Sequence, residues 1–128
     1  MAPWTIYSKM IIKENKKFKI PIQAISIVDE YLEHARIMVF CNGGKERTFI
    51  SSADWMVRNI DHRVEVACPI FEKPIQQELK DILQIQLKDN IKARILDNEL
   101  ANQYVNPRNT KKIRSQVETY NYLYRKSL

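Results

Sequence analysis

His34 and Arg36 are the two residues whose types and spacing fit chemistry on a phosphate group. In an extended segment, residues i and i+2 point to the same face, so the spacing predicts that their side chains lie side by side. A guanidinium offers fixed donors to phosphoryl oxygens, and an imidazole can attack phosphorus or move a proton near neutral pH. The alternative is that His34, next to Glu33, forms an ordinary surface ion pair or is a core residue whose polar atoms are satisfied.

Small polar side chains follow, where two predicted strands end. Hydroxyl, amide and carboxylate groups in such places can line a cleft beside the histidine and arginine. They can equally satisfy local backbone groups, and the carboxylate can cap the segment that follows it. These candidate residues are Asn42, Ser51, Ser52 and Asp54.

Metal and nucleophile motifs give no further candidates. His34 and His62 lack ligand spacing with Cys41 or Cys68, so no zinc site is predicted. No acidic cluster with a spacing suited to Mg²⁺ stands out. A Gly-x-Ser-x-Gly elbow, a Walker loop and a Gly-x-Gly-x-x-Gly turn are all missing from the sequence.

Apolar patterning and turn residues predict the elements that must position these side chains. Asn42-Gly43-Gly44 can adopt positive φ, which predicts a hairpin between the strands on either side. Strands followed by a long amphipathic helix predict an α/β or α+β fold, with a mixed β-sheet flanked by helices. The predicted strands are 22–28, 36–41, 48–50, 64–68 (ending at Pro69) and 93–96; the predicted helices run from Pro74 to Asn90 and over 113–123, and 107–109 is a loop.

Length and composition describe an ordinary globular chain of 128 residues. This length predicts one domain, which we place at 22–128, after an N-terminal segment 1–21 of undefined role. No apolar run is long enough to span a membrane, and the start lacks the basic region of a secretory signal, so we expect the cytoplasm, with association at a membrane surface left open. Two cysteines are too few for a disulfide framework and are expected to be buried in apolar surroundings.

The net charge of +6 is concentrated at the two ends of the chain. Residues 1–20 carry five lysines against one glutamate, and residues 106–128 carry six basic residues against one glutamate. Basic ends can bind an anionic partner such as polyphosphate, nucleic acid or a membrane surface. Without clustered aromatic residues, the interpretation we favour is that they are solvated faces.

Four short motifs, in order and at consistent spacing, resemble the last domain of bacterial polyphosphate kinases. They are LEHARI (32–37), NGG (42–44), SSADWM (51–56) and RVEV (63–66). The resemblance runs from about Ile22 to Ala93, and the terminal Ser115-Gln116 helix also resembles the end of that family.

This family is part of the phospholipase D-like superfamily, whose general pattern is His-x-Lys, an acidic or amide residue, and Gly-Ser-x-Asn. The corresponding residues are His34-Ala35-Arg36, Asn42 and Ser51-Ser52-Ala53-Asp54, with arginine in place of lysine. Val57 stands where the family usually has proline, and His62 stands where arginine is common. The resemblance therefore implies a phospholipase D-like half-domain.

The resemblance implies reversible transfer of the terminal phosphate of ATP to polyphosphate, with ATP or ADP and Mg²⁺ as nucleotide and cofactor. In that family the site has two halves, and a phosphohistidine forms in the half that precedes this one. The resemblance implies that His34 acts as acid/base and phosphate clamp, with Arg36 as its charge partner. Further implied phosphate- or substrate-binding residues are Asn42, Ser51, Ser52, Asp54, Arg58 and Arg63.

Three functions remain open at this point. The chain can be a catalytic-domain fragment that is inactive alone, because the phosphohistidine half is missing from it. It can be a homodimeric phosphodiesterase or nuclease of the phospholipase D type, which rebuilds a two-histidine site across a twofold axis. It can also be a non-catalytic module that binds polyanions, with no specific nucleic acid partner.

Overall fold

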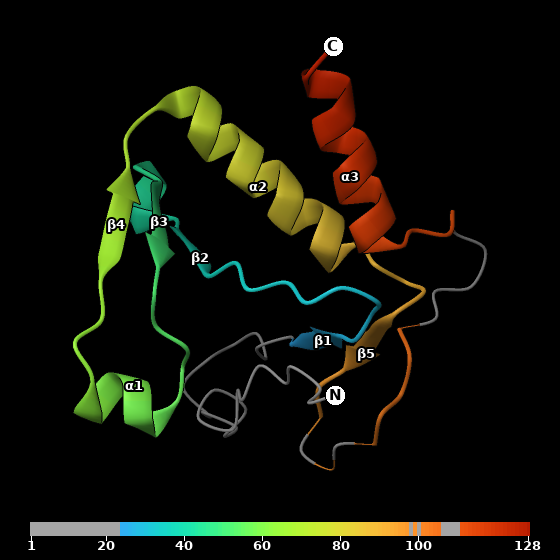
Figure 1. The fold of residues 1–128 in the computed structure, drawn as a ribbon, viewed down its shortest axis with the longest axis horizontal. Coiled ribbons are helices and arrows are strands. Elements are labelled where there is room, and N and C mark those ends of the chain that lie inside the picture. Colours follow the sequence, from blue (N-terminus) through green and yellow to red (C-terminus); the bar gives the residue numbers. More distant parts are fainter. Residues whose placement is uncertain (1–23, 98, 100, 106–110) are drawn as a thin grey trace. The chain divides into compact units, whose positions relative to one another are not determined.

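The computed structural model describes residues 24–97, 99, 101–105 and 111–128 (Figure 1). The predicted N-terminal segment 1–21, Ile22 and the predicted loop 107–109 lie outside these residues. The chain divides into two units, one formed by residues 33–84 and the other by residues 1–32 together with 85–128. Each unit is described by itself.

The unit of residues 33–84 contains a three-stranded antiparallel sheet in the order β2-β3-β4. Its strands are β2 (Ile37–Phe40), β3 (Arg47–Ser51) and β4 (Ala67–Ile70). The predicted hairpin is confirmed, with Ile37 opposite Ile50 in β2 and β3. The connecting turn needs positive φ at Asn42 (46°), Gly43 (62°) and Gly44 (88°), a conformation that glycine adopts without a steric penalty.

The strand predicted at 64–68 is shifted toward the C-terminus. β4 begins at Ala67 and continues through Pro69, which lies opposite Phe49, whereas Val64 is 97% exposed. The prediction was wrong because it ended the strand at the proline. Among the described strands β4 is an edge of its sheet, and an edge strand tolerates a residue without an N–H group.

Two helices begin in this unit. The short helix α1 (Val57–His62) was not predicted, whereas α2 (Lys73–Leu87) matches the predicted amphipathic helix and has Pro74 in its first turn. The amide of Gln76 donates to the backbone oxygen of Ile70 at 2.7 Å, and Lys80 forms an ion pair with Glu46 at 2.8 Å. These bonds tie α2 to β4 and to the start of β3.

The other unit contains a two-stranded antiparallel sheet and the C-terminal helix. The strands are β1 (Ile25–Ile27) and β5 (Ala93–Ile95), and the helix is α3 (Ser115–Lys126). β5 and α3 confirm predicted elements, although α3 begins and ends later than predicted. Helices beside sheets make this an α/β fold, as predicted, and all described strands pair in antiparallel fashion in two separate sheets.

Asp89 joins three parts of this unit through backbone hydrogen bonds. Its side chain is almost fully buried, and Oδ1 accepts N–H bonds from residues 91, 92 and 93 at 3.0, 2.7 and 3.0 Å. Oδ2 accepts the N–H of Ser115, the first residue of α3, at 2.7 Å. One carboxylate therefore connects the end of α2, the start of β5 and the start of α3, and it satisfies a donor that a helix N-terminus leaves unpaired.

A second polar contact fixes the approach to α3. Arg114 binds Asp29 through two bonds, from Nε at 2.8 Å and from Nη2 at 2.7 Å, and also reaches Glu30 at 3.0 Å. The paired hydrogen bonds from Arg114 hold the pKa of Asp29 below its ordinary value against the effect of burial. Arg114 therefore ties the residues just after β1 to the start of α3.

Buried polar residues outnumber buried apolar ones in the described part of the chain. Ala93 is the buried apolar residue there, while the buried polar residues are Ser26, Thr48, Asn59, Gln76, Asp89 and Ser115. The prediction that both cysteines are buried is wrong, because Cys41 and Cys68 are exposed. Within the described residues, no helix is both long enough and apolar enough to cross a bilayer.

Candidate functional site

His34, Arg36 and Asp54 form one cluster at the start of the β2–β3 hairpin. Nη2 of Arg36 lies 2.5 Å from Nε2 of His34, and Nε of Arg36 donates to Oδ1 of Asp54 at 2.7 Å. The same Oδ1 atom lies 3.6 Å from Nε2 of His34. The imidazole and the guanidinium are therefore side by side, as their spacing predicts, and a carboxylate 18 residues away joins them.

The hairpin explains how Asp54 reaches this pair. The N–H of Ser51 donates to the carbonyl of Arg36 at 2.9 Å, so the ladder of β2 and β3 extends one residue beyond Ile37 and Ile50. Asp54 follows Ser51 by three residues and can return to the Arg36 side chain. The sequence analysis placed both strands but did not predict this ion pair.

The cluster is open to solvent and contains opposite charges. The side chain of His34 is 47% exposed, and those of Arg36 and Asp54 are 23% and 24% exposed. The hydrogen bond from Arg36 holds the pKa of Asp54 below its ordinary value, despite partial burial, and the charge of Arg58 acts in the same direction. The same bond raises the pKa of Arg36, so the pair is ionised near neutral pH.

The two serines have local partners. Oγ of Ser51 accepts the N–H of Ala53 at 3.1 Å, and Oγ of Ser52 accepts the N–H of Val66 at 3.0 Å while donating to Glu65. These contacts are those of hydroxyl groups that satisfy the backbone at a strand end. Their role toward a substrate remains a prediction.

Glu65 and Asn59 are members of the network that sequence reasoning missed. The buried Asn59 donates from Nδ2 to Oε1 of Glu65 at 2.7 Å, and the hydrogen bonds from Ser52 and Asn59 lower the pKa of Glu65. The Ser52 N–H also donates to the Val66 carbonyl at 3.0 Å. The loop that carries Asp54 is therefore closed at both ends.

The other candidate residues lie outside the cluster's hydrogen bonds. Nδ2 of Asn42 donates to the carbonyl of Lys45 at 3.0 Å, which stabilises the hairpin turn. Arg58 in α1 and Arg63 just after it are both exposed. In the described part of the chain, no group of three His, Cys, Asp or Glu side chains is arranged to hold a metal ion.

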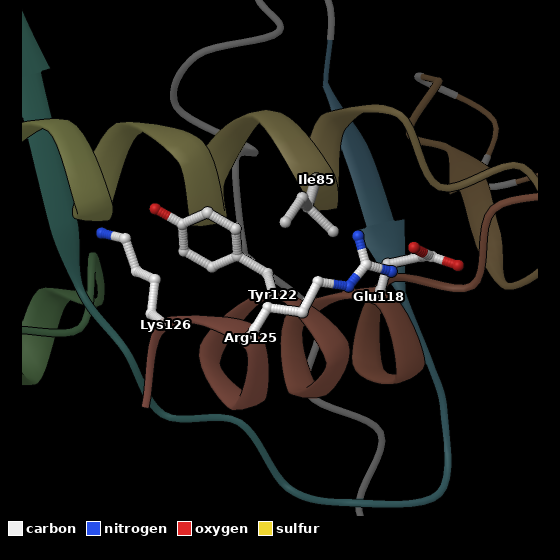
Figure 2. A pocket seen from close by; sticks show the side chains of 5 residues that line it. All are labelled: Ile85, Glu118, Tyr122, Arg125 and Lys126. Atoms are coloured by element: carbon white, nitrogen blue, oxygen red, sulfur yellow. The ribbon is translucent and has the colours of Figure 1, made fainter. Parts of the chain in front are cut away.

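A hollow of about 320 Å³ lies between α3 and the end of α2, in the other unit (Figure 2). It is lined by Ile85, Glu118, Tyr122, Arg125 and Lys126. Lys126 Nζ lies 5.1 Å from the ring centroid of Tyr122, a cation–π distance. None of the residues predicted for the site lines this hollow.

The fold and the cluster define an α/β protein in which a histidine, an arginine and an aspartate lie together, partly open to solvent. Comparison with known families matches residues 7–116 to the polyphosphate kinase C-terminal domain 2. The chain belongs to this family.

Individual relatives agree with this assignment. The chain is 53% identical to the polyphosphate kinase of Vibrio cholerae and 50% identical to that of Escherichia coli K12, each over 102 residues and 80% of this chain. A crystal structure of polyphosphate kinase from Porphyromonas gingivalis matches with a TM-score of 0.77 and 50% identity, over 81% of this chain and 16% of that one. The chain spans about 15% of the length of these curated relatives.

Proposed function

We propose that this chain supplies the second half of a polyphosphate kinase active site, in which the terminal phosphate of ATP is transferred reversibly to polyphosphate. The observation that carries the proposal is the contact between Arg36 and His34 beside Asp54, exposed at one end of a hairpin. Family membership and the identity to polyphosphate kinases support the substrate class. The His-x-Arg and Ser-Ser-x-Asp spacing supports a phospholipase D-like origin for this half.

Arg36 and His34 have different roles in this proposal. The guanidinium binds phosphoryl oxygens and stabilises the charge that develops on them during transfer. The imidazole gives or takes a proton, a contribution worth about 10²–10⁴-fold in rate when the group is well positioned. The nucleophilic histidine belongs to the other half of the site, and a covalent phosphohistidine divides one difficult transfer into two easier ones.

ATP, ADP and polyphosphate are the proposed substrates, and their anionic oxygens suit the exposed arginines. Arg58 and Arg63 are proposed to attract the polymer, while Asn42, Ser51 and Ser52 are proposed to line its path. The described residues offer no cluster that fits Mg²⁺, so no step is assigned to the metal. The proposed location is the cytoplasm, where ATP is available.

A chimera tests the catalytic assignment. In it, this chain replaces the matching region of the Vibrio cholerae polyphosphate kinase, and polyphosphate synthesis from ATP is measured. We expect His34→Ala to lower the rate by about 10²–10⁴-fold, because proton transfer is lost. The matched control is His62→Ala at the exposed end of α1, which should leave the rate unchanged. An active His34→Ala chimera refutes the role of His34.

The isolated chain separates this proposal from the two other functions. We expect the 128-residue chain alone to make no polyphosphate, because its two histidines do not include the implied nucleophile. Phosphodiester cleavage by a homodimer would favour a phospholipase D-type enzyme. Salt-sensitive binding of polyphosphate that survives both His34→Ala and Arg36→Gln would favour a non-catalytic polyanion-binding module.

A further inference from the structure

We infer that Arg36 and Asp54 are alternative partners of a single atom, Nε2 of His34, and that phosphate binding exchanges one partner for the other. Arg36 donates a hydrogen bond to this nitrogen while the nitrogen is unprotonated. Asp54 accepts a hydrogen bond from it once it is protonated. The inference rests on the proposed function and assigns Asp54 as a positioning residue. Asp54 is then not a substrate ligand.

The resting state follows from what each group can donate. A guanidinium carries N–H donors and has no acceptor, so the 2.5 Å contact from Arg36 Nη2 requires a lone pair on Nε2 of His34. The neutral ring must then carry its proton on Nδ1. In this state Nε2 cannot take a proton, because Arg36 covers it.

Asp54 has the opposite hydrogen-bonding character. An ionised carboxylate only accepts, so Oδ1, at 3.6 Å, offers nothing to a bare Nε2 but can accept from a protonated one. The same Oδ1 holds Nε of Arg36 at 2.7 Å. Asp54 therefore anchors the base of the guanidinium while the tip, Nη2, is able to move.

Competition between phosphate and His34 for the N–H groups of Arg36 drives the exchange. Phosphoryl oxygens compete for the N–H groups of Arg36, which is reachable from solvent. When Nη2 turns to phosphate, Nε2 can form an N–H bond with a proton from a phosphate hydroxyl or water, whose O–H bond breaks. The resulting imidazolium lies beside the Asp54 carboxylate.

Other charges near the cluster must be considered in this exchange. The charge of Arg58 in α1 acts on Asp54, and that of Glu65, just before β4, acts on Arg36. Glu33 precedes His34 in the chain. The Asp54 carboxylate lies within 4 Å of both His34 and Arg36.

Nitrogen NMR of ¹⁵N-histidine-labelled full-length chain tests the resting state. The chain has two histidines, so His62 at the end of α1 is an internal control. At a pH of about 7.5, above the ordinary histidine range, we expect His34 to show a single Nδ1–H tautomer and His62 to show the averaged signals of a solvated ring. An averaged His34 ring, or one protonated at Nε2, overturns the inference.

Titration with sodium tripolyphosphate tests the exchange itself. At saturation we expect the His34 signals to move to those of imidazolium, while those of His62 stay in place. In Asp54→Asn the imidazolium signal should be lost, and in the matched control Asp61→Asn, an exposed α1 carboxylate, it should remain. Amide spectra of both variants report whether the fold is kept, and the wild-type titration decides the exchange if Asp54→Asn does not fold.

The outcomes separate the inference from the proposed function. Arg36-dependent binding of tripolyphosphate without a change at His34 overturns the exchange and leaves the phosphate site standing. If the chain does not bind tripolyphosphate, both the phosphate site and the exchange are refuted. The His34 tautomer measured without tripolyphosphate still tests the contact with Arg36 by itself. If Asp54→Asn behaves like the wild type in this titration, Asp54 has no part in the exchange.

Discussion

Asp89→Asn should destabilise the unit built from β1, β5 and α3 more than any other single isosteric change there. The carboxylate accepts four backbone N–H bonds while 1% exposed. An amide places an NH₂ group where one oxygen was, so at least one bond is lost and two donors face each other. A lost bond to a charged group is worth about 1.5–3 kcal/mol and a buried unsatisfied donor costs about 1–3 kcal/mol, so we expect about 2.5–6 kcal/mol in total.

The pH dependence of stability gives this prediction a second, independent signature. Burial raises the pKa of Asp89, but the N–H bonds from Ser115, Lys92 and Ile91 outweigh burial and hold the pKa below its ordinary value. A carboxyl with a lowered folded-state pKa stabilises the fold above the unfolded pKa of about 3.9, and that stability is lost as the pH falls through the folded value. The wild type should therefore lose more stability on acidification than Asp89→Asn.

Urea unfolding followed by circular dichroism at a pH of about 7 and a pH of about 3 measures both effects, on either side of the usual carboxyl range. Asp61→Asn, the same chemical change at an exposed site in α1, is the control and should be within about 0.5 kcal/mol of the wild type. The reasoning is refuted if Asp89→Asn unfolds at the same urea concentration as the control at neutral pH. It also fails if the two variants lose stability equally in acid.

Two further predictions concern the hairpin and the cysteines. Gly43→Ala should destabilise the hairpin by about 1–2 kcal/mol, because φ is +62° there, although no atom lies within 4 Å of the added Cβ. Gly43→Asn should destabilise it less, since Asn42 already adopts a φ of 46°. Equal urea midpoints for the two variants would contradict the strain argument. Cys41 and Cys68 are exposed, so both should react with a thiol reagent such as dithionitrobenzoate in the folded chain, and thiols that react only in denaturant would contradict the exposure.

Local signals in the sequence were sufficient to predict the hairpin and the long helix. Asn42-Gly43-Gly44 fixes the turn through positive φ, and apolar residues at helical spacing fix α2. The contact between His34 and Arg36 also follows from local spacing, because two residues apart on extended backbone point the same way. These features depend on residues close together in the chain.

Contacts between distant residues determine what the sequence did not predict. α3 begins at Ser115 because Asp89, 26 residues earlier, accepts its N–H, and the apolar stripe that predicted a start at 113 contains no such information. The six-residue α1 is too short for a periodic pattern to identify. β4 was misplaced because proline usually interrupts a strand, and only its position at a sheet edge removes the conflict.

Asp54 is the part of the candidate site that depends most on such distant contacts. It lies in a loop that leaves β3 and returns to β4, and its position opposite Arg36 depends on how the loop is closed. Ser52 bonds Val66 through both its N–H and its hydroxyl oxygen, and Glu65 receives bonds from Ser52 and Asn59. Glu65 therefore supports the loop that carries Asp54.

In the proposed function, the residues that bind phosphate differ from those that keep the loop of Asp54 in place. Arg36 and His34 lie just before β2 and are partly open to solvent, whereas Ser52, Asn59 and Glu65 are hydrogen-bonded to one another in the loop that carries Asp54. An unpaired carboxylate at position 54 would repel phosphate. The Asp54 carboxylate is instead paired with Arg36, whose guanidinium it holds in place. A guanidinium can bond Asp54 through Nε and still present Nη2 to a second partner, so Arg36 joins the carboxylate and the imidazole at once.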